Sequence, residues 1–540
     1  MQKGYGTGAS PGEAVGKLHW YKREEKEIPR YKPAAPKAEW ERFLSAQQEV
    51  IAQLGELADR ARKEAGEEAA LLFKTHQFMA EDTDLEDAVR TAILETPVNA
   101  ETAVQEAADE FAEMFAQMED PYFQARAADV KDVAGRLLAV LGGRKKGQVD
   151  LSEPVVLAAE DLSPSETMQL DRGKLLGFVT TGGSASGHTA ILARTMEIPA
   201  IIGIGDFLKP EMEGHLVLIR GENGEVVVDP DPEMVRAVEE KAEAQRRYKE
   251  ELESLKGLPS VTQDGRSIKI YCNIASPRDV PAVLRNDAEG IGLFRSEFLY
   301  LGRDDLPDEE TQFEAYKTVL TDMGEKNVII RTMDIGADKK VEYLGLPKEE
   351  NPALGVRALR ICLNRPELFR TQLRALYRAS AFGHLKIMFP MVTSVWEVLE
   401  AKKLCDEVKQ ELKEAGIPFD GNVQVGVMIE TPAAVLISDL LAKEVDFFSC
   451  GTNDLTQYTL ACDRQNKDLG RFFDPHHPAV LRALKLVCEN AHRYGREVGV
   501  CGELAADMTM TEEFLNMGMD ELSVAPGAVL PLRNKVREIS

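Results

Sequence analysis

The sequence predicts a multidomain α/β protein in which an α/β domain, interrupted by a helical insertion, precedes a (β/α)8 barrel of the TIM type. Three observations predict this fold. Strand-like runs flank a glycine-poor helical block in the first 230 residues, and one long polar helix follows them. Eight apolar, β-rich runs then alternate with helical segments over about 280 residues. A chain of 540 residues is also too long for one hydrophobic core.

The first α/β domain is expected in two parts, residues 1–30 and 144–230. The run AVGKLHWYK at 14–22 has a strand pattern, and a short helix is expected at Thr189–Met196. The further strands are expected at Pro154–Ala158, Leu176–Thr180, Ala200–Gly203 and Glu225–Val228.

The insertion, residues 31–143, is rich in Ala, Glu, Leu and Gln, which favours a helical bundle. Between Ile51 and Asp120 it holds 18 acidic and 5 basic residues. Taken alone, this excess indicates a solvated acidic bundle. The sharper alternative is a docking face for a small basic protein, attracted by the long-range field.

A linker helix is expected over residues 231–258, because this segment has too few apolar positions for a core element. The barrel is expected over residues 259–540, and an open doubly wound sheet is the structural alternative. We favour the barrel because polar residues follow its strands repeatedly. The expected strands are Ile268–Ile274, Gly290–Phe294, Val328–Met333, Ile387–Pro390, Gln424–Ile429, Val445–Cys450, Val498–Cys501 and Glu521–Val524.

The polar residues at these strand ends would converge on one mouth of a barrel. Arginines clamp phosphate and carboxylate oxygens, and two carboxylates beside an amide oxygen suit Mg²⁺ or Mn²⁺. A thiol at the same mouth can donate a proton or act as a nucleophile. The residues concerned are Arg295, Arg331, Asp334, Glu430, Asn453, Asp454 and Cys501.

A second candidate site lies in the segment TTGGSASGHTAILART, where a glycine-rich loop precedes His188 at the start of a helix. The N-terminus of a helix favours an anion, so a phosphorylated imidazole would be stabilised there. Arg194, six residues later, is a candidate for charge compensation. On spacing alone, a glycine-rich turn with an incidental surface histidine fits equally well.

Composition excludes several classes of protein. The net charge of −26 disfavours a non-specific nucleic-acid binder, and no apolar run is long enough to span a membrane. The first residues, MQKGYGTGASPG, lack the apolar stretch of a secretory signal. Seven cysteines without a CxxC motif fit a reducing cytoplasm. These features predict a cytoplasmic enzyme without membrane insertion.

Four segments together resemble Enzyme I of the bacterial phosphotransferase system, the phosphoenolpyruvate–protein phosphotransferase family. They are GGSASGHTAILART, RTMDIGADK (Arg331–Lys339), GTNDLTQYTLACDR (Gly451–Arg464) and GVCGEL (Gly499–Leu504). The resemblance extends over essentially the whole chain. It implies transfer of a phosphoryl group from phosphoenolpyruvate to a histidine of the chain and then to the phosphocarrier protein HPr, with release of pyruvate. It also implies a homodimer formed through the barrel.

The resemblance implies a role for each matched residue. His188 is the phosphorylated histidine, reacting through Nε2, and Thr167 hydrogen-bonds its ring. Cys501 protonates C3 of the enolate, and Glu430 with Asp454 binds Mg²⁺, for which Mn²⁺ is an alternative. The residues that hold phosphoenolpyruvate are Arg295, Arg331, Asn453, Asp454 and Arg464, with Lys339 in the same region. HPr docks on the helical insertion, where His76, Asp82 and Asp84 lie in the contact region.

The sequence departs from the family beside the phosphorylated histidine. Ser186 and Gly187 stand where the family has Thr-Ser, so a hydroxyl next to His188 is missing. Three alternatives are less consistent with the sequence. A dikinase-like enzyme would need a nucleotide-binding segment, a regulatory module would be expected to lack the residues of the mouth, and a carbon–carbon lyase would need no His188 domain.

Overall fold

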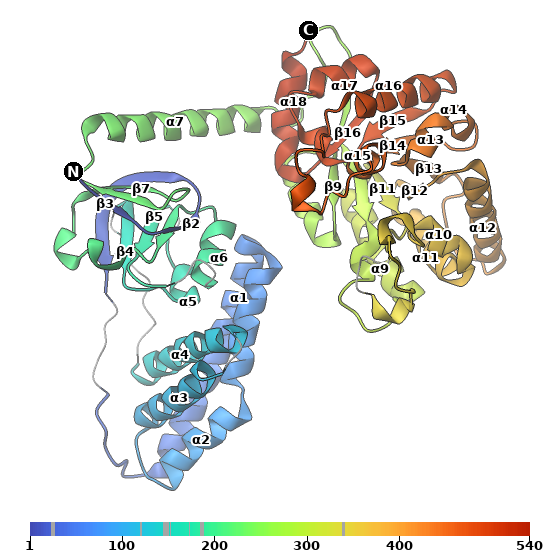
Figure 1. Cartoon of the computed structure of the whole chain (residues 1–540). Coiled ribbons are helices and arrows are strands. Elements are labelled where there is room, and N and C mark those ends of the chain that lie inside the picture. The colour runs from blue at the N-terminus through green and yellow to red at the C-terminus, as the bar shows by residue number, and fades with distance from the viewer. Residues whose placement is uncertain are drawn as a thin grey trace. The chain divides into compact units, whose positions relative to one another are not determined.

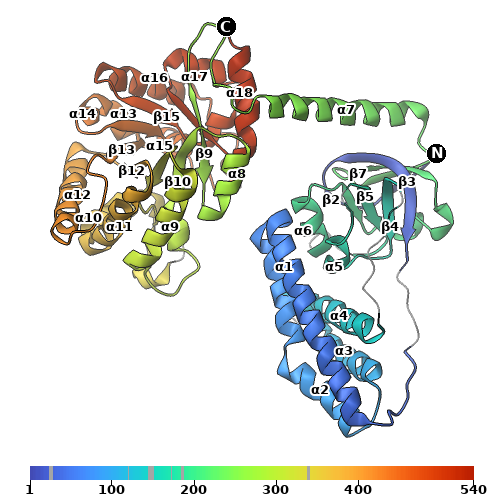
Figure 2. The same cartoon turned by 180° about the vertical axis from the view of Figure 1, so that it is seen from behind.

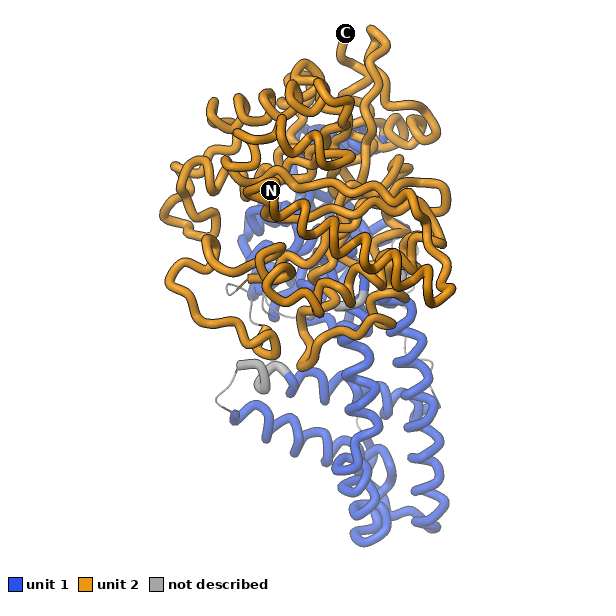
Figure 3. The backbone as a smooth tube through the Cα atoms, turned by 90° about the vertical axis from the view of Figure 1, so that its right-hand side faces the viewer, with its two compact units in different colours: residues 1–246 blue, residues 247–540 orange. Residues whose placement is uncertain are grey.

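The computed structural model describes residues 1–22, 28–118, 121–143, 151, 153–171, 173–183, 188–336 and 341–540, without the side chains of residues 63–65, 67–68, 121–125 and 188. The chain divides into two compact units, residues 1–246 and 247–540 (Figure 3). Within the part of the chain so described, no helix is long and apolar enough to cross a membrane.

The first unit contains an eight-stranded mixed sheet in the order β1-β8-β7-β3-β4-β5-β6-β2. Strands β3 to β6 run parallel at its centre, and β1, β8, β7 and β2 pair antiparallel at its two sides. The strands are β1 (Gln2–Tyr5), β2 (Thr7–Ser10), β3 (Glu13–Tyr21), β4 (Val155–Ala159), β5 (Leu175–Thr180), β6 (Ala200–Ile202), β7 (Leu216–Arg220) and β8 (Glu225–Val228). Sequence analysis did not predict β1, β2 and β7.

The glycine in β2, Gly8, explains why strand propensity does not predict this strand. A Cβ at Gly8 would lie 2.1 Å from the carbonyl oxygen of Gly221, so the two backbones approach too closely for any side chain. A short strand built for close approach has little of the β-branched, apolar signature on which strand prediction depends.

Among the described residues, four helical stretches form the insertion between β3 and β4, the first with a non-helical break at Gly66, and two short helices lie on the α/β part (Figures 1 and 2). They are α1 (Pro36–Ala80), α2 (Thr83–Leu94), α3 (Ala100–Ala116), α4 (Pro121–Leu141), α5 (Pro164–Thr167) and α6 (His188–Thr195). One apolar core contains Phe73 and Val104 of the insertion together with Phe178 and Leu192 of the α/β part. The insertion is therefore joined to the α/β fold by buried side chains as well as by its two chain connections.

Helix α7 (Pro232–Ser254) has Val238 as its buried residue and leads into the second unit. There, eight parallel strands close into a barrel in the order β10-β11-β12-β13-β14-β15-β16-β9. This confirms the predicted barrel and rules out the open sheet. The strands are β9 (Lys269–Ile274), β10 (Gly290–Arg295), β11 (Asn327–Arg331), β12 (Leu385–Phe389), β13 (Gln424–Ile429), β14 (Phe447–Cys450), β15 (Glu497–Val500) and β16 (Glu521–Val524).

Helices surround the barrel and complete its (β/α) units (Figure 1). They are α8 (Val280–Arg285), α9 (Glu309–Met323), α10 (Leu359–Asn364), α11 (Pro366–Ala379), α12 (Val395–Glu414), α13 (Pro432–Leu436), α14 (Ser438–Leu441), α15 (Thr452–Leu460), α16 (Pro478–Arg493), α17 (Thr511–Met517) and α18 (Val529–Glu538).

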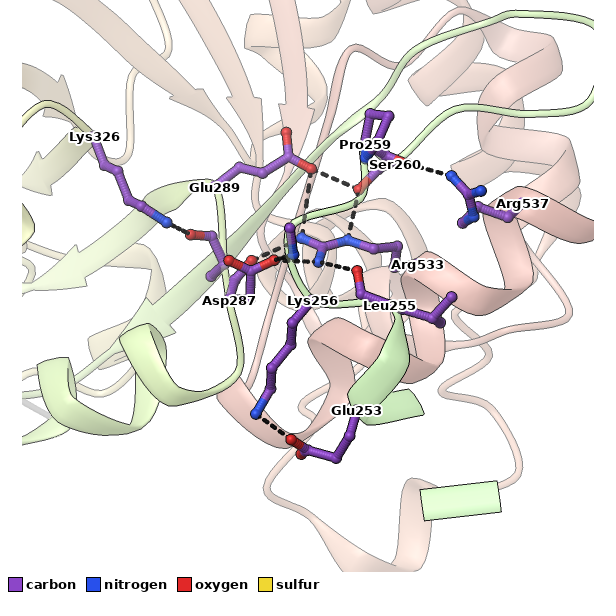
Figure 4. A network of polar contacts seen from close by, with 12 residues as sticks. Glu253, Leu255, Lys256, Pro259, Ser260, Asp287, Glu289, Lys326, Arg533 and Arg537 are labelled. Carbon is purple, nitrogen blue, oxygen red and sulfur yellow. Dashed lines mark hydrogen bonds and ion pairs between the residues drawn. The ribbon is translucent and has the colours of Figure 1, made fainter. Parts of the chain in front are cut away.

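Arg533 on α18 ties the end of the barrel to its beginning (Figure 4). Its buried guanidinium donates to Asp287 Oδ2 at 2.6 Å, to Ser260 Oγ at 3.2 Å and to the carbonyl oxygen of Leu255 at 3.2 Å. Because a buried charge is costly unless it is paired, this network favours one placement of the last helix against the segment that follows α7.

Glu521, the first residue of β16, is buried inside the barrel. A Cβ at Gly292 would lie 2.2 Å from Glu521 Oε1, so glycine there leaves room for the carboxyl group. Burial raises the pKa of Glu521 to about 8, although the charges of Lys386 and Lys269 act in the opposite direction. The carboxyl group is therefore largely protonated in the folded protein at neutral pH.

The raised pKa of Glu521 predicts a pH dependence of stability. Between its unfolded value of 4.5 and about 8, the folded state holds a proton that the unfolded state has released. The free energy of unfolding should therefore fall as the pH rises through this window, by at most about 1.4 kcal/mol per pH unit for one proton. We expect Glu521→Gln to remove at least about 1 kcal/mol of the decrease between pH 5 and pH 8. Urea unfolding of both proteins at several pH values measures this, and parallel curves would contradict it.

Candidate active site

The closed barrel brings the predicted polar residues to the C-terminal end of its strands. Arg295 ends β10 and Arg331 ends β11, where the two residues pair in register. Glu430 follows β13 directly, and Cys501 follows β15. Asn453 and Asp454 lie in the first turn of α15, just after β14. This is the end of a (β/α)8 barrel at which active sites are built.

Arg331 is held at this mouth by two carboxylates. Its Nη2 donates to Glu297 Oε1 at 2.6 Å, and its Nη1 lies 3.1 Å from Asp334 Oδ2. Although burial opposes the charge, Glu297 and Asp334 raise the pKa of Arg331 above its ordinary value. Its Nε has no hydrogen-bond partner among the described residues. The guanidinium is thus oriented and has an unused N–H group.

Arg357 extends this network. Its Nη2 donates to Asp334 Oδ1 at 2.8 Å, and its Nη1 donates to the hydroxyl of Tyr458 at 3.2 Å. Sequence analysis did not select Arg357 or Glu297. Glu297 stands two residues after Arg295, which is a weak signal that a strand end carries more than one functional side chain. Arg357 precedes α10 in an irregular segment, where no periodicity marks it.

Glu430 is a fully buried acid of the mouth. The backbone N–H of Met391 donates to its Oε1 at 2.6 Å, while its Oε2 has no partner among the described side chains and backbone. Burial, followed by the charges of Asp454 and Asp334, raises the pKa of Glu430 to about 8. A divalent cation would relieve this repulsion and use the free oxygen, so Glu430 and Asp454 fit a metal site.

These two carboxylates do not complete a metal site by themselves. Within the described residues, no group of three or more His, Cys, Asp and Glu side chains is arranged to hold a metal ion. Sites for Mg²⁺ commonly have one or two carboxylates and take their other ligands from water and substrate phosphate. The arrangement is therefore that of an open site.

Cys501 is buried inside the mouth, and burial raises the pKa of its thiol to about 11. Its Sγ lies 3.7 Å from the carbonyl oxygen of Cys450. It packs in an apolar cluster with Leu293, Ile329 and Met388, while Ser449 and the charged Arg331 and Glu430 also lie near the thiol. At neutral pH this thiol keeps its proton, which suits a proton donor better than a standing nucleophile.

The remaining predicted residues of the mouth are less constrained. Asn453 exchanges two hydrogen bonds with Glu503, one to Oε1 at 3.1 Å and one from its backbone N–H at 3.0 Å. Arg295 and Arg464 are exposed, so their guanidinium groups are accessible to an anion. Lys339 lies outside the described residues.

The histidine site belongs to the first unit. His188 begins α6, but its side chain and residues 184–187, including Ser186 and Gly187, lie outside the description. Thr167 is fully buried on α5, where its Oγ1 donates to the carbonyl oxygen of Ser163 at 2.9 Å. Arg194 is exposed and donates to the carbonyl oxygen of Ala9 at 3.1 Å.

In the helical insertion, the structure differs from expectation at His76. Its side chain is 0% exposed, with Nε2 3.1 Å from Asp129 Oδ1, so it does not lie on the surface as expected for a residue that contacts a partner. Asp82 and Asp84 are exposed at the start of α2, where Asp82 caps the helix by accepting from the backbone N–H of Asp84. His76 follows Phe73 by three residues and lies on the same buried face of α1.

Three family descriptions match the chain. They are "PEP-utilising enzyme, N-terminal" over residues 5–126, "PEP-utilising enzyme, mobile domain" over 151–224, and "PEP-utilising enzyme, PEP-binding domain" over 249–540. The last of these alone covers more than half of the sequence.

Curated relatives match nearly the full length. The phosphoenolpyruvate-protein phosphotransferase of Priestia megaterium is 44% identical over 536 residues, which cover 99% of this chain and 94% of the relative. That of Bacillus subtilis is 43% identical over 541 residues, which cover 100% and 95%. A solution structure of an Enzyme I protein is 34% identical, with a TM-score of 0.39, and the match covers 45% of this chain and 99% of that one. The chain therefore belongs to the phosphoenolpyruvate–protein phosphotransferase family of transferases.

Proposed function

We propose that this chain transfers the phosphoryl group of phosphoenolpyruvate to His188 and then to a histidine of the phosphocarrier protein HPr, as the first step of a sugar phosphotransferase system in the cytoplasm. The observation that carries the proposal is the mouth of the barrel, where a fixed guanidinium, two carboxylates and a protonated thiol meet. Membership of the family supports it. All seven cysteines are free, which agrees with a reducing compartment.

At the mouth, Arg331 would bind the phosphate or carboxylate of phosphoenolpyruvate, with Arg295, Asn453 and Arg464 completing the clamp. Glu430 and Asp454 would hold Mg²⁺, or Mn²⁺, which would neutralise charge on the transferring group. Lys339 belongs to the same proposed binding region.

The proposed reaction breaks the bond between phosphorus and the C2 oxygen and forms a bond between phosphorus and His188 Nε2. The electron pair stays on the oxygen as an enolate, and Cys501 gives the thiol proton to C3, which completes pyruvate. The thiolate regains a proton from water. Protonation of carbon converts the enolate to pyruvate, so the buried thiol completes the forward reaction.

His188 belongs to the first unit and the mouth to the second, so loading and delivery require His188 to meet two partners in turn. We infer that a swivel of the histidine domain links these two half-reactions. In this proposal Thr167 orients the ring of His188, and Arg194 supports the charge of the phosphoryl group.

The docking surface proposed for HPr lies on α1 and the start of α2. Leu71 and Phe78 on α1 are 59% and 69% exposed, one heptad apart on the same face. Exposed Glu81, Asp82 and Asp84 border them. An apolar centre with an acidic border suits a small basic partner.

A homodimer through the barrel is part of the same proposal. Large apolar side chains are exposed at Trp396 and Leu399 on α12, at Leu436 on α13 and at Leu440 on α14. Such exposure on the surface of a barrel is typical of a contact with a second subunit.

Phosphoryl-labelled phosphoenolpyruvate with Mg²⁺ tests the loading step. We expect the wild-type protein to acquire label that is stable to alkali and labile to acid, and we expect no label on His188→Ala or after removal of the metal with EDTA. Label on His188→Ala would place the phosphoryl group elsewhere and contradict the proposal. Circular dichroism of the variant serves as the control for folding.

Phe78→Ser tests the docking surface. We expect the KM for HPr to rise about tenfold or more, because an exposed aromatic anchor is lost, while loading from phosphoenolpyruvate stays unchanged. Met114→Ser on α3 is the matched control, since Met114 is also exposed in the insertion at 46%. If both substitutions raised the KM for HPr equally, or if neither changed it, the proposed surface would be contradicted.

A further inference from the structure

A buried polar cluster lies where the helical insertion meets the α/β part of the first unit. It combines side chains of α1, α4 and α5, all nine-tenths or more buried. Its members are His76, Asp129, Asp132, Arg136, Ser165 and Glu166. None of them belongs to the mouth of the barrel or to the docking surface.

Direct contacts run through this cluster from one helix to the next. His76 on α1 places Nε2 3.1 Å from Asp129 Oδ1 and Nδ1 3.6 Å from Asp132 Oδ2, both on α4. Ser165 on α5 donates from Oγ to Asp132 Oδ1 at 2.8 Å. The ion-pair distance between His76 and Asp132 and the hydrogen bond from Ser165 to Asp132 therefore connect α1 to α5 in a chain of contacts by way of α4.

At one end of this chain, α5 is tied to the start of α6. Thr189, the second residue of α6, donates from Oγ1 to the carbonyl oxygen of Leu162 at 2.5 Å, just before α5. Ser163 and Glu166 form a capping box on α5, which also carries Thr167. A displacement of α5 would consequently move the backbone from which His188 projects.

At the other end, α1 carries the docking side chains Leu71 and Phe78 on its exposed face. His76 lies between them in sequence and on the buried face. The chain of contacts thus begins under the proposed docking surface and ends beside the start of α6.

Charge makes this junction specific. Arg136 is buried and lies in the field of Asp132 and Glu166, and its Nε and Nη2 have no hydrogen-bond partner among the described residues. Such groups are tolerated only where opposite charges surround them, so they favour one arrangement of the helices that carry them. An apolar contact between the insertion and α5 would allow the helices to shift against each other, whereas the buried charges of this cluster favour one arrangement.

We propose that His76, Asp132 and Ser165 are positioning residues that hold the start of α6, and with it His188, in register with the docking helix α1 for delivery of the phosphoryl group. This inference rests on the proposed function. Loading takes place at the mouth of the barrel and does not use the docking surface. The contact chain should therefore matter for transfer to HPr and not for transfer from phosphoenolpyruvate.

Ser165→Ala tests the inference, because it removes the hydrogen bond to Asp132, together with a 3.1 Å bond between the hydroxyls of Ser163 and Ser165, and leaves both surfaces intact. We expect the kcat of transfer to HPr to fall about tenfold, while the KM for HPr and the rate of labelling by phosphoenolpyruvate stay within about twofold of wild type. The matched control is Thr102→Val, which removes a buried 2.8 Å bond from Thr102 Oγ1 to Asn99 Oδ1 inside the insertion. Its kcat for delivery should remain at the wild-type value.

Two variants at Asp132 distinguish a positioning role from a packing role, and they test the inference if the Ser165→Ala protein does not fold. Asp132→Asn keeps an oxygen that can accept from Ser165, whereas Asp132→Ala does not, so delivery should be faster in the first variant than in the second. Equal delivery rates in this pair, or a parallel loss of loading and delivery in Ser165→Ala, would overturn the positioning role. A wild-type protein that acquires no label would instead overturn the proposed function itself.

Discussion

Buried charge at the mouth of the barrel is the constraint on which the rest of the second unit depends. Arg331 is surrounded by protein, and its charge is acceptable only because Glu297 and Asp334 lie within hydrogen-bond or ion-pair distance. Asp334 in turn accepts from Arg357, so one aspartate orients two guanidinium groups. The pairing of β10 with β11 brings these side chains together, because Glu297 follows β10 while Arg331 ends β11 and Asp334 comes soon after it.

The same mouth also holds two acidic residues, Glu430 and Asp454, and the thiol of Cys501. Burial and the neighbouring Asp454 raise the pKa of Glu430, while burial alone is the main reason why Cys501 keeps its proton. In the proposed reaction, the carboxyl group that ionises with difficulty would bind a cation and the neutral thiol would protonate the enolate. The first unit uses buried charge differently, since His76, Asp132 and Arg136 meet where helices join and not where a substrate binds.

Much of this architecture could be predicted from the sequence, because the barrel strands are short apolar runs and several of them end at or just before a polar residue. Glu430 and Cys501 were found in this way, and the structure places them at the predicted strand ends. Prediction failed where the signal is not periodic. The glycine-containing β2 lacks strand propensity, and Arg357 lies in an irregular segment. His76 shows a different limit, since an isolated histidine in an acidic helix does not reveal which face it occupies until its partners on α4 are known.

In the proposed mechanism, one histidine, His188, receives the phosphoryl group and passes it on. The most direct measurement is a single-turnover experiment with the labelled protein, freed of phosphoenolpyruvate and mixed with HPr in a rapid-quench apparatus. We predict that the label leaves His188 and appears on HPr at least as fast as the enzyme turns over. Retention of label on the protein, while HPr becomes phosphorylated only when phosphoenolpyruvate is present, would contradict the relay.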